Sequence, residues 1–400
     1  ASGASGVRAI LVDALLALLE HDIVPVIPER GSVGASGDLS PLAHLALAMI
    51  GEGEARQGDT LLEGREVMEA AGMAPLELGP KDGLALLNGT QVSASLAIEG
   101  LFATERLLRS AVVGGALSVE ALAGSHAPFD ERIHTARNQQ GQAVVAEAFR
   151  NLLTKSSIWE SHRNCGRVQD PYSARCQPQV LGAVWDTLAH AATILEREAN
   201  AATDNPLVFS DAVISGGNFH AAPVGLVADF MAIALADLGS LSERRVDTFM
   251  RGVNPALPLF LAPQPGLESG FMLAHVSAAA LASENKTLAH PASVDTVPTS
   301  AGQEDHVSMA PWAGLKLLRI ADNVASMLAI EFAAAAVALD RQQPLTTTAA
   351  LQPVHELIRQ HVRAYNTDRR HDRDIEALKK LVTEGDIARH LPASAWRTPW

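Results

Sequence analysis

Cysteine is scarce in this chain, because its 400 residues include only two, Cys165 and Cys176. Two cysteines cannot build a disulfide framework, so we expect a reducing, cytoplasmic compartment and treat both as small buried side chains. Basic residues are also few: 31 Lys and Arg stand against 45 Asp and Glu, which gives a formal net charge of -14. Proteins that bind nucleic acid or anionic membranes normally carry a basic surface, so we expect neither as a partner.

The sequence also lacks a long apolar run without charges. The two most apolar stretches are interrupted by charged residues, Asp229 and Asp237 in the first and Arg319, Asp322 and Glu331 in the second. A bilayer crossing is therefore not expected. The opening residues 1–8 contain neither an initiator Met nor a basic segment followed by an apolar one. We interpret this opening as a cut in a longer chain and expect an N-terminal truncation.

Apolar residues at helical spacing dominate the rest of the sequence, which is 48% hydrophobic. Residues 181–195 and 317–328 repeat apolar side chains at three- and four-residue steps, which favours amphipathic helices. Further helices are expected near residues 5–21, 83–110, 131–154, 223–246, 273–289 and 349–365. Strand-like runs are limited to 23–27 and 213–214. These patterns predict an all-α fold built as a long antiparallel helix bundle.

Glycine and proline interrupt the helical pattern in residues 51–80, which we interpret as a link made of turns. The sequence then predicts three consecutive parts. Residues 1–85 form a small N-terminal part that carries a glycine-rich loop. Residues 86–345 form the central long-helix bundle, and residues 346–400 form a more polar, helical peripheral layer.

The glycine-rich loop runs from Gly31 to Asp38 and precedes an apolar helical run. Ser40 is a suitable N-cap and Pro41 suits the first helical position, so we expect the loop at the positive end of a helix dipole. A plain turn is one interpretation of the loop. A phosphate loop is weaker, because the Walker A lysine and the dinucleotide-binding glycine spacing are absent. A hydrolase nucleophile at Ser36 is also weak, since the Gly-x-Ser-x-Gly spacing is missing.

Ala35, Ser36 and Gly37 allow a fourth interpretation, in which the tripeptide cyclises on itself. The amide nitrogen of Gly37 would attack the carbonyl carbon of Ala35 with loss of water, and Ser36 would lose its hydroxyl as a second water. The product is 4-methylideneimidazol-5-one (MIO), an electrophilic alkene. Glycine has no Cβ to block the approach, alanine is small, and serine supplies the leaving hydroxyl.

The loop and four later blocks resemble the histidine and phenylalanine ammonia-lyase family, in the family's order. The blocks are Gly31 to His44, Leu86 to Gln91, Gln169 to Gln179, Ser215 to His220 and Gln303 to Met309. The resemblance implies an all-α fold of this family and an MIO group formed from Ala35, Ser36 and Gly37, with no external cofactor. It also implies a homotetramer whose active sites draw residues from more than one subunit.

Within the family, the chain resembles the members that act on histidine in having Tyr172 followed by Ser173, and in having Glu304. Members that act on phenylalanine or tyrosine carry Gln in place of Glu304. The resemblance therefore implies an ammonia-lyase that converts L-histidine to trans-urocanate and ammonia, the first step of histidine degradation. A carboxylate suits an imidazole because it accepts an N–H bond and favours a charged ring.

The remaining candidate residues follow from what ammonia elimination requires. Arg175 is expected to clamp the substrate carboxylate, since a guanidinium pairs with a carboxylate in a two-pronged geometry. The resemblance implies the same role for Arg175, a catalytic phenol for Tyr172, and ring packing for Phe219. It implies hydrogen bonds to the prosthetic group and substrate for Asn88 and Gln169.

Several histidines could suggest a metal, namely His44, His126, His220, His290 and His306. None of them has His-Glu-x-x-His or Cys-x-x-Cys spacing, so we expect no catalytic metal. The family's catalytic tyrosine base and a substrate-contacting histidine lie upstream of the region matched here, so the resemblance implies that both precede Ala1.

Two other functions stay open on the sequence. The first is a tyrosine or phenylalanine ammonia-lyase or aminomutase with the same MIO chemistry, against which Glu304 argues. The second is a non-catalytic helical scaffold, against which the intact tripeptide, Tyr172 and Arg175 argue.

Overall fold

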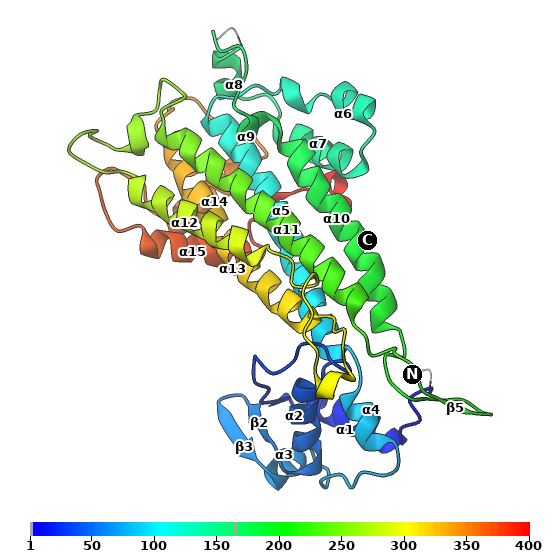
Figure 1. Cartoon of the computed structure of the whole chain (residues 1–400). Coiled ribbons are helices and arrows are strands. Elements are labelled where there is room, and N and C mark those ends of the chain that lie inside the picture. The colour runs from blue at the N-terminus through cyan, green and yellow to red at the C-terminus, as the bar shows by residue number, and fades with distance from the viewer. Residues whose placement is uncertain (1–2, 164–165) are drawn as a thin grey trace. The chain divides into compact units, whose positions relative to one another are not determined.

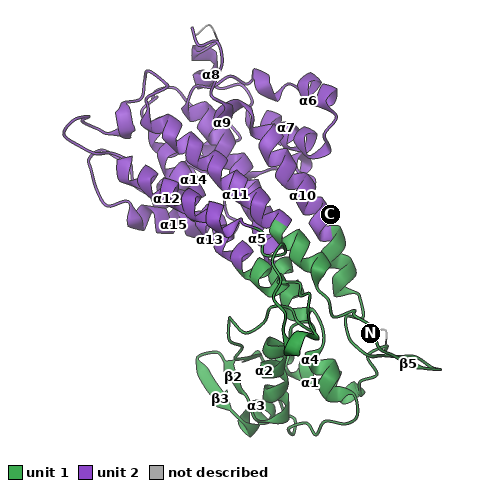
Figure 2. Ribbon diagram, viewed as in Figure 1, with its two compact units in different colours: residues 1–98, 193–229, 291–315 green, residues 99–192, 230–290, 316–400 purple. Residues whose placement is uncertain are grey.

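The computed structural model of the chain describes residues 3–163 and 166–400. Cys165 lies outside the described residues, and Cys176 is half-buried and has a free thiol. Helices make up 59% of the chain and strands 5%, which confirms the predicted all-α class. The chain divides into two compact units (Figure 2). Unit 1 comprises residues 1–98, 193–229 and 291–315, and unit 2 comprises 99–192, 230–290 and 316–400.

Each unit therefore combines segments from distant parts of the sequence, whereas the sequence predicted three consecutive parts. The predicted boundaries of those parts, after residues 85 and 345, stay a prediction. The helices α5 (Gln91–Ala121), α10 (Gln177–Ala199), α11 (Ala222–Met250) and α13 (Ala310–Asp340) each have residues in both units.

Unit 1 begins with a small α/β layer. Its strands β1 (Ile23–Pro25), β2 (Glu54–Gln57) and β3 (Thr60–Glu63) form an antiparallel sheet in that order. Its helices are α1 (Ala9–Glu20), α2 (Leu39–Ile50), α3 (Arg65–Ala70) and α4 (Asp82–Leu87). Apolar side chains from these helices and strands share one buried core, which includes Leu11, Leu18, Met49, Val67 and Leu86. A second hairpin pairs β4 (Leu207–Val208) with β5 (Val213–Ile214).

The interpretation of residues 51–80 as a link made of turns was wrong. This segment forms β2, β3 and α3, and these elements pack into the core of unit 1 through Ala55, Val67 and Met68. The strands were not predicted because neither shows apolar alternation. In β2 the one apolar residue, Ala55, is also the one buried residue, and in β3 the two leucines are adjacent and neither is fully buried. Strand pairing stabilises them instead: β2 pairs with β1, from Ile23 opposite Gln57 to Pro25 opposite Ala55, and β3 pairs with the other edge of β2.

Unit 2 contains the helix bundle (Figure 1). Unit 2 holds parts of α5, α10, α11 and α13. The helices that lie wholly within it are α6 (Glu131–Arg137), α7 (Gln140–Leu152), α8 (Ser157–Ser161), α9 (Tyr172–Arg175), α12 (Met272–Leu288), α14 (Gln352–His361) and α15 (Asp372–Thr383). Short 3-10 turns occur at Ala127–Phe129, Leu259–Leu261, Ala388–His390 and Ala393–Ala395, and one more, Ser300–Gly302, lies in unit 1.

Three helices of the bundle meet at a buried ion pair. Arg245 on α11 donates from Nε to Oε1 of Glu331 on α13 at 2.6 Å, and from Nη2 to Oε2 at 2.8 Å. Ser118 on α5 and Ser242 on α11 each donate a hydroxyl to the same carboxylate at 2.6 Å. All four residues are buried. Charges this deep are tolerated when they are paired and hydrogen-bonded, so the cluster fixes the register of α5, α11 and α13.

Two helices, α11 and α13, are long and apolar enough to span a membrane by length and composition, with mean hydropathy 1.7 and 1.5. Within the structure, 56% and 83% of those apolar windows are buried. Burial among neighbouring helices accounts for much of their apolar character, as in the core helices of a bundle.

Two predicted helices are broken, and one break matters for the site. Residues 131–154 form α6 and α7, separated at Asn138, which adopts a left-handed conformation (φ 56). The helix predicted over 83–110 is α4 and α5, separated at residues 88–90. Asn88 is extended there and can direct its side chain away from both helices, toward the glycine-rich loop.

Candidate active site

The glycine-rich loop belongs to unit 1 and leads directly into α2. A turn spans residues 35–38, and α2 begins at Leu39. The predicted N-cap at Ser40 was therefore wrong: Asp38 is the N-cap, and it makes no side-chain capping bond. The Asp38 carboxylate bonds to α5 instead. Its Oδ2 accepts hydrogen bonds from the backbone N–H of Ser93 at 2.8 Å and from the Ser93 hydroxyl at 3.0 Å, which links the loop to the start of α5.

Asp38 is fully buried, and burial raises the pKa of its carboxyl group, although the hydrogen bonds from Ser93 oppose that rise. Its backbone N–H donates to the carbonyl oxygen of Gly89 at 2.7 Å. The residue after the tripeptide is thus fixed on two sides, by backbone and by side chain.

The tripeptide itself is held in a tight turn. Ser36 has φ 51 and Gly37 has φ 81, so both lie in the left-handed region. The amide of Asn88, which is 4% exposed, donates from Nδ2 to the Ser36 carbonyl oxygen at 2.6 Å. A Cβ atom on Gly37 would lie 2.2 Å from the Gly89 carbonyl oxygen, so glycine alone fits this position. Asn88 and Gly89 thus position the turn from the break between α4 and α5.

The segment before α13 covers the loop from another side. The backbone N–H of Met309 donates to the Val33 carbonyl at 2.9 Å, and a Cβ on Gly34 would lie 2.1 Å from the Ser308 hydroxyl oxygen. This contact brings Glu304 to the tripeptide: the Ser36 hydroxyl donates to Oε1 of Glu304 in a short hydrogen bond.

Glu304 is half-buried, and three hydroxyl groups donate to its carboxylate. The hydrogen bonds from Ser300, Ser36 and Thr299 lower the pKa of Glu304 below its usual range. Donors that bind the charged form stabilise it. The side chain is therefore an anion at neutral pH and acts as an acceptor for N–H groups.

Phe219 is half-buried in unit 1, in the segment that follows β5. The next residue, His220, bonds through Nε2 to the carbonyl oxygen of His306 at 3.1 Å, and the two imidazole rings stack at 5.8 Å. Because His306 lies two residues after Glu304, this bond ties the Phe219 segment to the Glu304 segment. Unit 1 thus brings together Ala35, Ser36, Gly37, Asn88 and Glu304, with Phe219 linked through His220.

Gln169, Tyr172 and Arg175 belong to unit 2 and form a second group around α9. Arg175 donates from Nη2 to Oε1 of Gln169 at 3.0 Å, and its guanidinium carbon lies 4.7 Å from the centre of the Tyr172 ring. The Arg175 Nε is buried without a hydrogen-bond partner among the described residues, so it has a free donor for a carboxylate. Tyr172 is 71% exposed, as a side chain that meets a substrate or another subunit can be.

Asp170 anchors the segment that carries these three residues. Its carboxylate accepts the Ser125 backbone N–H at 2.7 Å and Nη1 of Arg167 at 2.6 Å. Both Gln169 and Asp170 line a cavity of about 600 Å³ in unit 2.

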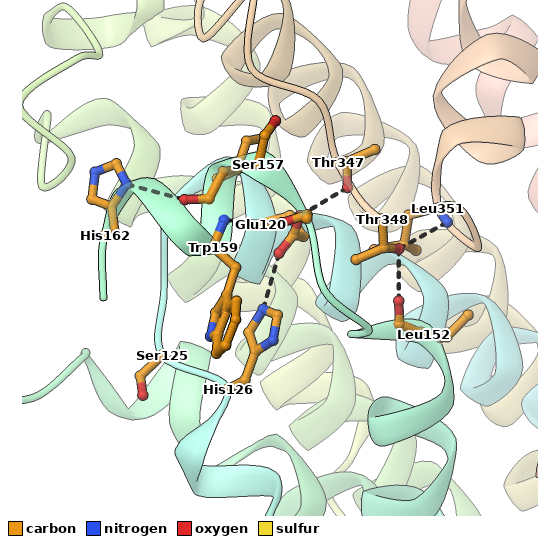
Figure 3. Close-up of polar contacts among 12 residues, drawn as sticks. Glu120, Ser125, His126, Leu152, Ser157, Trp159, His162, Thr347, Thr348 and Leu351 are labelled. Atoms are coloured by element: carbon orange, nitrogen blue, oxygen red, sulfur yellow. Dashed lines mark hydrogen bonds and ion pairs between the residues drawn. The ribbon is translucent and has the colours of Figure 1, made fainter. Parts of the chain in front are cut away.

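The wall of this cavity includes His126 and Trp159, whose rings stack at 5.6 Å (Figure 3). Nε2 of His126 contacts Oε1 of the buried Glu120 at 2.9 Å, and the Thr347 hydroxyl donates to Oε2 at 3.1 Å. The side chain of His126 is thus used in packing and in a paired carboxylate contact. Among the described residues, no group of three or more His, Cys, Asp or Glu could hold a metal ion.

Thr299 and Ser300 were not among the residues predicted from the sequence, although both donate to Glu304. Their run, Thr299-Ser300-Ala301-Gly302, has a turn signal at the glycine but no catalytic spacing. The roles of Asp38 and Ser308 were missed for a similar reason, since each acts through a tertiary contact: Asp38 joins the loop to Ser93, and Ser308 packs against Gly34.

Substituting Gly37 by alanine tests the fit of the tripeptide. We expect G37A to lower the free energy of unfolding by about 1–3 kcal/mol, because alanine is strained at φ 81 and its Cβ meets a backbone oxygen. Denaturant titration measures the loss. G72A is the matched control, since Gly72 has φ 71 but nothing within 4 Å of a Cβ. Equal stability of the two variants would contradict the close contact with Gly89.

The chain is similar to known proteins along most of its length. A family model described as aromatic amino acid lyase matches residues 1–360. The histidine ammonia-lyase of Idiomarina loihiensis is 55% identical over 389 residues, which cover 96% of this chain and 76% of that relative. The crystal structure of histidine ammonia-lyase from Trypanosoma cruzi has a TM-score of 0.90 at 39% identity, covering 98% of this chain and 76% of the other.

A tyrosine aminomutase from Streptomyces globisporus also has a TM-score of 0.90, at 35% identity over 96% of this chain and 77% of its own. The same architecture therefore serves proteins that are named for different amino acids and reactions. The family match over residues 1–360 and the relative at 55% identity together cover the glycine-rich loop, α9 and Glu304. The chain belongs to the aromatic amino acid lyase family.

Proposed function

We propose that this protein is an ammonia-lyase that converts L-histidine to trans-urocanate and ammonia, the first step of histidine degradation. The observation that carries the proposal is the contact between Glu304 and the Ser36 hydroxyl, which places an anionic acceptor directly at the tripeptide. The relatives from Idiomarina loihiensis and Trypanosoma cruzi, both named histidine ammonia-lyase, support the same substrate. We further propose a cytoplasmic location, with no nucleic acid or membrane as partner.

The residues of the loop fit an MIO group made from Ala35, Ser36 and Gly37. Ser36 is already in a left-handed turn, Gly37 occupies a position that no Cβ could share with the Gly89 carbonyl, and the Asn88 amide holds the Ser36 carbonyl oxygen. Such restraint lowers the entropy that a ring closure must lose. No external cofactor is needed for the proposed reaction.

Ammonia elimination is difficult because ammonia leaves poorly and the β-hydrogen is barely acidic. Ala35, Ser36 and Gly37 would carry the MIO group, which would supply an electrophilic alkene to this site. The residues of unit 1 then recognise the side chain. The Glu304 carboxylate accepts an N–H of the imidazole and favours its charged form, and Phe219 packs against the ring.

Recognition of the α-amino acid end falls to the residues around α9. Arg175 pairs with the substrate carboxylate through in-plane N–H donors such as Nε, which has no partner among the described residues. Gln169 keeps that guanidinium in place through Nη2. Tyr172 supplies a phenol near the reacting amine. We propose a homotetramer in which each active site combines such residues from more than one subunit.

A direct assay tests the proposed function. The natural full-length protein is purified and incubated with L-histidine, and trans-urocanate is followed by its absorbance while ammonia is measured separately. The proposal predicts equal amounts of the two products. Formation of a β-amino acid from tyrosine or phenylalanine, with no urocanate from histidine, would indicate an aminomutase instead. Absence of turnover with all three amino acids would favour a non-catalytic scaffold.

A further inference from the structure

Two hydroxyl groups of the preceding residues donate hydrogen bonds to one carboxylate oxygen of Glu304. Thr299 donates from Oγ1 to Oε2 of Glu304 at 2.8 Å, and Ser300 donates from Oγ to the same oxygen at 2.5 Å. The backbones of Thr299 and Glu304 are bonded in both directions, at 3.0 and 3.3 Å. Residues 299–304 thus form a small closed loop around one carboxylate oxygen.

The backbone of this loop adopts an unfavourable conformation. Ser300 has φ 48 and Ala301 has φ 55, which is the left-handed region for two consecutive residues that are not glycine. Side chains with a Cβ adopt this region at a cost, and such positions cluster at functional sites. The conformation turns the Ser300 hydroxyl back toward Glu304.

The two oxygens of Glu304 therefore have different partners. Oε2 accepts from Thr299 and Ser300, whereas Oε1 accepts from Ser36. Under the proposed function Ser36 loses its hydroxyl as water. Oε1 is then released from that donor, while Oε2 keeps both of its own.

We propose that Thr299 and Ser300 are positioning residues that fix Glu304 through Oε2, so that Oε1 accepts the imidazole N–H of the substrate. This inference rests on the proposed function, because it assigns histidine to that oxygen. A carboxylate on a flexible side chain loses rotamer entropy when it binds a ligand, and two fixed donors remove that cost in advance. The hydroxyl donors also keep the pKa of Glu304 low. The next two residues in its segment, Asp305 and His306, are also ionisable.

Inhibitor binding tests this role without requiring turnover. Imidazolepropionate and phenylpropionate share a carboxylate and a chain of equal length, but only the first carries a ring N–H. We expect T299V/S300A to weaken imidazolepropionate binding by about tenfold and phenylpropionate binding by a factor of about two or less, since hydrogen bonds to a charged group are involved. Calorimetry on the purified protein measures both.

Two matched variants separate positioning from general loop stability. T299S keeps the hydroxyl and should restore the preference for the imidazole ring that T299V lowers. T296V removes a hydroxyl that accepts the Val307 N–H at 2.9 Å in the same segment but does not touch Glu304, so it should affect both inhibitors alike. If T299V/S300A does not fold, the single variants T299V and S300A should each lower the preference in the same direction.

Three results would overturn the inference. T299V/S300A could leave the preference for imidazolepropionate over phenylpropionate unchanged, or T299S could lower that preference as much as T299V does. The unaltered protein could also show no such preference. The urocanate assay is a separate measurement. Loss of the imidazole preference in the variants would uphold the role of Thr299 and Ser300 even in a protein that failed to release urocanate, and in that case the proposed reaction alone would fail.

Discussion

Replacing Ser36 by alanine is expected to abolish the conversion of histidine to urocanate, lowering kcat by a factor of about 10³ or more, as the loss of a covalent catalyst does. Alanine tolerates φ 51 about as well as serine does, so the turn and the Asn88 contact should persist. The variant loses the hydroxyl that the proposed prosthetic group requires. Steady-state kinetics with histidine measures the effect, and circular dichroism checks that the fold is kept.

S32A is the control for this variant, because Ser32 lies in the same loop and its hydroxyl accepts the Gly34 N–H at 3.1 Å. It removes a loop hydroxyl without touching the tripeptide, so activity should fall by less than about tenfold, the scale of one neutral hydrogen bond. A fully active S36A would contradict the assignment of the tripeptide. Equal losses in S36A and S32A would indicate that loop rigidity, and not the Ser36 hydroxyl, determines the rate.

Replacing Glu304 by glutamine is expected to lower kcat/KM for histidine by a factor of about 10² or more, the size seen when an oriented charge is removed from an active site. Glutamine keeps the shape of the side chain but removes the negative charge that favours an imidazolium ring. One end of the amide also becomes a donor, so the hydroxyl groups of Thr299 and Ser300, or that of Ser36, must turn to accept from it. Kinetics with histidine measures the loss.

The pH dependence adds a second test of Glu304. The pKa of Glu304 in the folded protein is lower than usual, so its carboxylate stays charged throughout the neutral range. The negative charge is lost only as the pH falls through that lowered pKa. Glu304 itself does not titrate between pH 6 and 8, whereas the imidazole of the substrate does, with an ordinary pKa of about 6.5. E304Q should therefore lower kcat/KM more at pH 6, where the ring is largely charged, than at pH 8, where it is neutral. D305N alters the adjacent, exposed acid and should keep nearly full activity. Near-normal turnover of histidine by E304Q would contradict the role of this carboxylate.

The sequence predicted the large elements well, because they depend on apolar periodicity over many residues. The stripes at 181–195 and 317–328 lie within α10 and α13, whose apolar side chains are buried in the bundle. Short elements were harder. The strands β2 and β3 bury little of their own sequence. They depend on pairing with each other and, for β2, on pairing with β1, which lies about 30 residues earlier in the chain.

The site was predicted through its motifs but not through its supporting contacts. Ala35, Ser36, Gly37, Asn88 and Glu304 were identified from the sequence, and the structure brings them together in unit 1. The helical pattern of residues 83–110 concealed the break at Asn88, although this break is what lets the amide reach Ser36. Thr299 and Ser300 contact Glu304 across a turn in which Ser300 and Ala301 adopt left-handed conformations, which residue type does not predict.

The most direct test of the account is the mass of the proteolytic peptide that contains Ala35, Ser36 and Gly37, measured on the natural protein. We expect a peptide lighter than its sequence by two water molecules, together with a new near-ultraviolet absorbance that S36A lacks. A peptide of unaltered mass, in a protein that nevertheless released urocanate from histidine, would contradict the central claim that this tripeptide becomes the electrophile.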